Sequence, residues 1–125
     1  VSLHNVKVVD KRTKQVKNVF VHHHPHLHKF KLSVKGNFDE VISVGALSSL
    51  QKPLELLTGM ARKLKKNAQI TFVDYDKFFY ILPNVNWIEN DKQLISLFKK
   101  AGFKVEVTRK RSLLWTYIII KGKKI

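Results

Sequence analysis

Residues 38–76 constrain the fold most, because they have the pattern of a complete strand, helix and second strand. The apolar run at 38–47 is typical of a strand that lies buried in a parallel sheet. Ser48 opens a predicted helix, and Pro53 is tolerated in its first turn, where its missing N–H has no partner. A second strand follows at 69–74. Because a helical crossover joins parallel strands, almost always with right-handed sense, this unit predicts a parallel sheet.

The residues before this unit indicate two more strands, at 6–10 and 16–21, with a polar turn at 11–15. A histidine run follows, in which alternate imidazoles would share one face of an extended strand: His22, His24, His26 and His28. Imidazole binds zinc, copper or nickel, but no carboxylate or cysteine lies close in sequence to complete such a site. We therefore expect no metal and interpret the run as a polar strand end beside a cleft or an interface.

The residues after the unit indicate a helix and two strands. An aromatic segment at 77–83 predicts a short helix or cap across the end of the sheet. Asn90 has the position of an N-cap for a helix that ends before Gly102. A short basic loop joins strands at 103–108 and 113–121, which should therefore be antiparallel. The predicted fold is α/β: a sheet of about five or six strands, parallel in its middle, with an antiparallel pair at one edge.

Charge is the strongest global feature of the sequence. Lys and Arg number 24 against 9 Asp and Glu, which gives a formal net charge of +15 at pH 7. Such a field attracts nucleic acid or another polyanion, whereas a lysine-rich solvated surface is the alternative. Arg109, Lys110 and Arg111 lie in the predicted hairpin loop, where they would contact phosphates without reading sequence.

Length and composition exclude several classes of protein. A chain of 125 residues suits one domain with a real core. The sequence has no apolar run of the length that a membrane span requires, so we expect no membrane association. It has no cysteine, which excludes disulfides and thiolate chemistry and fits a cytoplasmic protein.

Particular segments carry a resemblance to a known family. They are the strand opening Phe38-Asp39 and residues 64–70 (LKKNAQI), 72–76 (FVDYD) and 97–105 (LFKKAGFKV). In this order they resemble the C-terminal half of the class I S-adenosylmethionine-dependent methyltransferases, over residues 38–121. The resemblance implies an incomplete Rossmann-like methyltransferase fold, with S-adenosylmethionine as the cofactor and methyl transfer as the reaction.

The glycine-rich loop that holds the amino-acid end of the cofactor in that family has no counterpart in this sequence. The five glycines lie too far apart to form it: Gly36, Gly45, Gly59, Gly102 and Gly122. The resemblance places Asp10 at the acid that binds the ribose hydroxyls, and His24 where an acid usually meets the adenine. Ser43 and Gly45 end the strand that approaches cofactor or substrate. A single domain, 1–125, that lacks the glycine-loop unit should bind S-adenosylmethionine weakly or not at all.

Tyr75 and Asp76 follow a parallel strand, where open α/β sheets place their ligands, so they are candidate substrate contacts. A structural N-cap is the alternative for Asp76. Ser43 lacks the strand–turn–helix motif of a nucleophilic serine, which argues against a hydrolase.

Two functions remain. The first is a methyltransferase-like protein whose cofactor site is truncated or degenerate, and which needs a missing segment, a partner chain or a homo-oligomer. The second is a non-catalytic, basic nucleic-acid-binding module on the same scaffold.

Overall fold

The computed structural model describes residues 7, 8, 10–12, 14, 15, 36–79, 81–83 and 85–125. The chain divides into two compact units, Val1–Phe30 and Lys31–Ile125. In the first unit, residues 7, 8 and 10–12 are helical and residues 14 and 15 form a turn. The predicted strand at 6–10 is therefore wrong at its described positions. Asp10 lies three residues after Lys7 and four before Lys14, a spacing that favours a helix.

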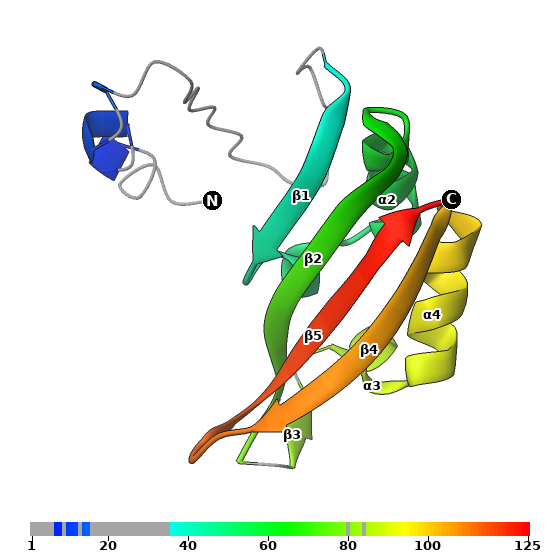
Figure 1. The fold of residues 1–125 in the computed structure, drawn as a ribbon. Coiled ribbons are helices and arrows are strands. Elements are labelled where there is room, and N and C mark those ends of the chain that lie inside the picture. The colour runs from blue at the N-terminus through cyan, green and yellow to red at the C-terminus, as the bar shows by residue number, and fades with distance from the viewer. Residues whose placement is uncertain (1–6, 9, 13, 16–35, 80, 84) are drawn as a thin grey trace. The chain divides into compact units, whose positions relative to one another are not determined.

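The predicted strand at 16–21 and the histidine run, His24 included, lie outside the described residues. The second unit carries the sheet, and its strands are numbered as in Figure 1. They are β1 (Phe38–Val44), β2 (Leu64–Phe78), β3 (Leu82–Pro83), β4 (Phe103–Arg111) and β5 (Trp115–Lys124).

The strand order is β1-β2-β5-β4, and β3 pairs with β2. β1 and β2 are parallel, as the crossover predicted, and Val44 lies opposite Val73. β5 is antiparallel both to β4, as predicted, and to β2. The prediction of a sheet that is parallel in its middle is therefore wrong for the described residues, which hold one parallel pair. The reason is that the hairpin inserts β5, its second strand, directly beside β2.

The helices of this unit all lie on one side of the sheet (Figure 1). They are the 3₁₀ turn η2 (Leu47–Ser49) and the helices α2 (Pro53–Ala61), α3 (Asn86–Glu89) and α4 (Asp91–Lys100). Between them and the sheet lies an apolar core in which Phe98 is fully buried. Its ring meets Phe72 of β2 edge-on at 5.4 Å and Phe103 of β4 at 6.3 Å between centroids. Each such buried side chain contributes roughly 1.5–3 kcal/mol through its removal from water. No described helix is long and apolar enough to cross a membrane.

The crossover differs from its prediction in where the helix lies. Pro53 is the first residue of α2, as its missing N–H suggests, but Ser48 belongs to η2. α2 ends at Ala61, and β2 begins at Leu64, before the predicted start of the strand at 69. The pairing of β2 with β1 shifts register where Asn67 has a φ of 64°. Asn tolerates this left-handed conformation better than most residues.

The aromatic segment at 77–83 is not a helix. β2 continues to Phe78, a turn follows, and Leu82 of β3 pairs back with Phe78. Phe79, at the turn, has a φ of 48° and donates its N–H to the carbonyl of Leu114 at 2.8 Å. The aromatic side chains of this segment favour a β-strand, and this preference explains why it forms strands and a turn instead of a helix.

Both caps predicted for α4 are confirmed. The side chain of Asn90 accepts from the backbone N–H groups of Lys92 at 3.0 Å and Gln93 at 3.2 Å. Gly102 ends the helix with a φ of 96° and donates to the carbonyl of Lys99 at 3.0 Å. The helix is thereby held in register against β4, which starts at the next residue.

The last glycine of the sequence has a packing role. Gly122 lies opposite Val105 in the hairpin, where the two backbones come close. A Cβ atom at this position would press on the carbonyl of Lys104 and lie 2.7–2.8 Å from atoms of Val105. Gly59, inside α2, has nothing within 4 Å of the corresponding position.

We expect Gly122→Ala to lower the free energy of unfolding by roughly 1–3 kcal/mol, since the hairpin must open to admit a methyl group. Gly59→Ala is the control and should be neutral or stabilise the protein by up to about 1 kcal/mol, because alanine favours a helix. Urea denaturation measures both. A Gly122→Ala protein as stable as the parent would contradict the close approach of β4 and β5.

Candidate functional site

One edge of the sheet is formed by the carboxyl end of β1, where Val44 lies opposite Val73, and by the part of β2 that continues from there to Phe78. Gly45 follows β1 there and donates its N–H to the carbonyl of Val73 at 2.8 Å. Its φ of 67° lies in the left-handed region, where glycine carries no penalty. Apart from its two chain neighbours, no atom of the described residues lies within 4 Å of the place where its Cβ would be. The backbone of Gly45 is therefore accessible at the edge where open α/β sheets bind ligands.

A buried carboxylate fixes the turn after β1. Asp74 is 2% exposed, and its Oδ2 accepts the backbone N–H of Ser48 at 2.8 Å. Its Oδ1 accepts the N–H of Tyr75 at 2.7 Å and the hydroxyl of Ser48 at 3.3 Å. Asp74 thus ties η2 to the end of β2 and holds the chain that leaves Gly45. This role was not predicted from the sequence, although an acid at the end of an apolar strand is a recognisable signal.

Asp76, a candidate substrate contact, lies within β2 rather than after it, and its side chain is buried and paired. It is 2% exposed, and its Oδ2 accepts from Nε of Arg109 at 2.7 Å. Arg109 also pairs with Asp91 and donates to the carbonyl of Ile88 at 2.7 Å. Burial alone would lower the pKa of Arg109, but the hydrogen bonds to Asp91 and Asp76 outweigh it and raise the pKa. The guanidinium is therefore charged at neutral pH, and its contribution to stability is lost only as the pH rises through that raised pKa.

The residues predicted to contact phosphates do not lie on one face of the sheet. Arg109, Lys110 and Arg111 belong to β4, not to a loop. Successive side chains of a strand point to opposite faces. Arg109 thus faces the helices, with its partners, whereas Lys110 lies opposite Tyr117 on the other face and is exposed. Arg109 is consequently occupied by protein groups.

The remaining predicted residues lie in different places. Ser43 is half-buried near the end of β1, two residues before Gly45. Tyr75 is 41% exposed on β2, next to Asp74. The structure therefore brings Ser43, Gly45 and Tyr75 to one edge of the sheet. Asp10 lies in the first unit, whose position relative to the second is not determined.

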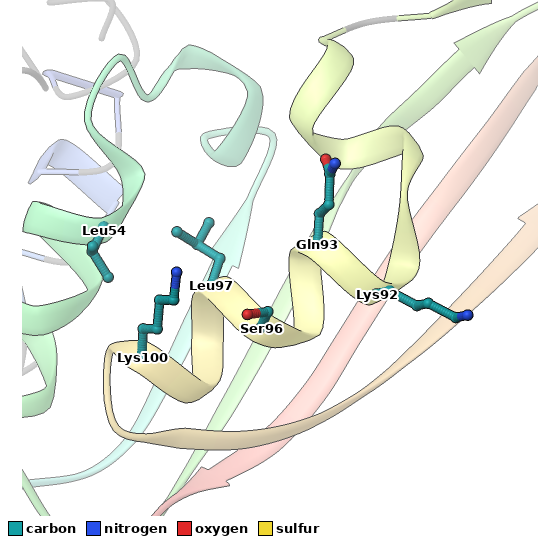
Figure 2. Close-up of a pocket in the computed structure, with 6 residues that line it drawn as sticks. All are labelled: Leu54, Lys92, Gln93, Ser96, Leu97 and Lys100. Atoms are coloured by element: carbon teal, nitrogen blue, oxygen red, sulfur yellow. The ribbon is translucent and has the colours of Figure 1, made fainter.

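A shallow groove of about 390 Å³ lies elsewhere, between α2 and α4. Figure 2 shows its lining side chains: Leu54 on α2 and Lys92, Gln93, Ser96, Leu97 and Lys100 on α4. Lys92 points away from the others in this view. The groove is open and carries no acid or other group suited to catalysis, so we do not assign it a function. Among the described residues there is also no group of three or more metal-ligating side chains.

We expect Asp74→Ala to lower the free energy of unfolding by about 2–4 kcal/mol, because three donors lose their acceptor. Ser48→Ala is the control. It removes only the 3.3 Å hydroxyl contact and should cost less than about 1 kcal/mol. Hydrogen exchange should show faster opening of the Ser48 amide in Asp74→Ala alone. Equal, small effects of both substitutions would show that Asp74 does not hold the turn.

Comparison with known proteins gives matches in structure alone. No family model matches the sequence, and no curated protein matches it. The fold matches a SAM-dependent methyltransferase from Aquifex aeolicus with a TM-score of 0.73 and 17% identity, over 100% of this chain and 66% of that one. It matches N-methyltransferase NodS from Bradyrhizobium japonicum, in complex with S-adenosyl-L-homocysteine, with a TM-score of 0.69 and 12% identity, over 99% and 63% of the two chains.

A third match is the 16S rRNA (adenine(1408)-N(1))-methyltransferase from Catenulisporales acidiphilia, with a TM-score of 0.54 and 15% identity. It covers 73% of this chain and 52% of that one. The present chain thus spans two thirds or less of the length of these three proteins. Identities this low show the fold and not the activity. Over most of its length, the chain has the fold of the class I S-adenosylmethionine-dependent methyltransferases.

Proposed function

We propose that this chain is a methyltransferase-like protein whose 125 residues supply only part of a cofactor site. The observation that carries the proposal is the edge formed by Gly45 and the Asp74–Ser48 contact. It combines accessible backbone after a parallel strand with a turn fixed by a buried carboxylate. One structural neighbour, N-methyltransferase NodS, is a complex with S-adenosyl-L-homocysteine, which supports the choice of cofactor.

The described residues do not complete a site for that cofactor. Ser43 and Gly45 can line one side of it. The sequence has no two glycines close enough for the loop that would receive the cofactor's charged amino-acid end. Backbone N–H groups at a loop and helix N-terminus are what such an anionic end requires. The proposal therefore includes a further segment or a partner chain, which a second copy could also provide, as the source of those groups.

We expect titration calorimetry of this chain with S-adenosylmethionine to show no saturable binding below about 1 mM. The reason is the missing donors for the cofactor's carboxylate. S-Adenosylhomocysteine should behave alike, since the defect does not concern the methyl group. Dissociation constants of about 1 μM would contradict the proposal, and Asp10→Ala should then abolish the binding if that residue holds the ribose.

A second candidate function is binding of nucleic acid, and the charge favours it. The chain has a net charge of +15, and one structural neighbour acts on 16S rRNA. Because each neutralised phosphate releases condensed counterions, such binding would weaken steeply with salt. Arg109 is occupied by Asp76 and Asp91, so other cations must carry this function.

A further inference from the structure

The face of the sheet opposite α2, α3 and α4, here called the open face, is covered by none of the helices described between residues 36 and 125 (Figure 1). Cross-strand pairing shows which residues share it. Tyr75 of β2 lies opposite Tyr117 of β5, and Tyr117 lies opposite Lys110 of β4. Directly opposed residues of a sheet point to the same side. The open face thus carries aromatic rings in its middle strands and lysines beside them.

The rings form one connected cluster near the end of β2. Tyr75 lies 4.9 Å from Trp115 and 5.3 Å from Tyr117 between ring centroids. A register shift between Tyr75 and Lys77 then brings Phe78 to the same cluster, 4.4 Å from Trp115. Tyr75 is 41% exposed and Trp115 37%. Large aromatic surfaces of this kind are usually buried or used for binding.

The charges that β4 and β5 carry on the open face, from the cluster toward the other end of the two strands, are predominantly positive. On β4 and β5 the open face carries four exposed lysines and one exposed glutamate: Lys104, Lys110, Lys121, Lys123 and Glu106. Lys121 lies opposite Glu106, whereas Lys110 stands beside the aromatic ring of Tyr117. Flat aromatic rings stack on bases, and lysines beside them neutralise phosphates.

We propose that the open face binds single-stranded nucleic acid, with bases stacked on Trp115 and Tyr117 and the backbone following the lysines of β4 and β5. This inference rests on the second candidate function above and identifies its site and its ligand. A single strand fits because its bases can leave their stack, whereas those of a duplex are enclosed. A second copy of the chain is disfavoured as the occupant, since two surfaces of equal positive charge repel each other.

The first experiment uses Trp115 as a reporter in the full 125-residue chain. Trp87 is the other of the two tryptophans, so Trp87→Phe leaves Trp115 as the only indole. Titration with an oligothymidylate of about 12 nucleotides at about 50 mM salt should quench its fluorescence, because bases stack on the ring. A duplex of equal length should leave the emission nearly unchanged.

Substitutions then separate stacking from charge. Trp115→Leu keeps an apolar side chain and should weaken single-strand binding roughly tenfold, without an equal loss for duplex. Lys121→Ala with Lys123→Ala should reduce the slope of log K against log salt by about 1.4 units. The matched control removes two exposed lysines from α4, on the other side of the sheet, by Lys99→Ala with Lys100→Ala. It should leave the slope nearly unchanged. Thermal melting identifies any variant that fails to fold, and the two lysine pairs test the site without altering a ring.

The possible results distinguish the inference from the function on which it rests. Absence of any binding at about 50 mM salt would overturn both, because nonspecific contacts are strongest there. Binding with equal effects of the two lysine pairs and no quenching of Trp115 would leave the candidate function and overturn the site. A Trp115 emission that responds to anionic phospholipid vesicles but not to the oligonucleotide would also overturn it, in favour of a membrane surface. A Trp115 emission that changes with neither the vesicles nor the oligonucleotide, in a chain that still binds oligonucleotide, would likewise overturn the site, because the bases would not stack on that ring.

Discussion

The contact of Arg109 with Asp76 determines how the second half of the chain is assembled. Asp76 lies near the end of β2, Arg109 lies on β4, and the same guanidinium reaches Asp91 at the start of α4 and the carbonyls of Ile88 and Glu89. One side chain thus joins the long strand, the hairpin and the helix pair. A buried pair adds little net stability over an apolar pair of equal volume, but loss of one partner leaves a buried charge. The contact therefore specifies the arrangement more than it stabilises it.

Side chains near the end of β2 alternate between the two faces of the sheet, so Asp74 and Asp76 lie on one face and Tyr75 on the other. Both acids point toward the helices, where Asp74 fixes the turn after β1 and Asp76 holds Arg109. Tyr75, between them, points to the open face and joins Trp115. The two acids are consequently structural, whereas Tyr75, between them, belongs to the aromatic cluster. A methyltransferase fold would place its ligand edge beside these same strand ends.

Much of the second unit could be predicted from the sequence because its signals are local. The first strand, the crossover, the Asn90 cap and the glycine at the end of α4 each depend on neighbours a few residues away. The burial predicted for the first strand is wrong, because β1 is the end strand of the described sheet and its residues are exposed or half-buried. The long-range features could not be predicted. Nothing near Arg109 in sequence indicates Asp76, its partner 33 residues away, and so a half-buried, paired cation was interpreted as a phosphate contact. The position of β5 beside β2, which makes that pair antiparallel, likewise follows from packing between distant segments. At the candidate site, Ser43 and Gly45 were predicted from their place at the end of a strand, whereas the role of Asp74 required the fold.

Arg109 and Lys110 are neighbours in sequence but lie on opposite faces of β4, so that Arg109 is paired with buried Asp76 and Lys110 is exposed. The most direct test is the free energy of unfolding of Arg109→Met beside that of Lys110→Met, both measured by urea denaturation. Arg109→Met leaves the carboxylate of Asp76 buried without its cation and should cost about 3–5 kcal/mol. Lys110→Met changes an exposed side chain and should cost less than about 0.5 kcal/mol. Losses that agree within about 0.5 kcal/mol would contradict the account.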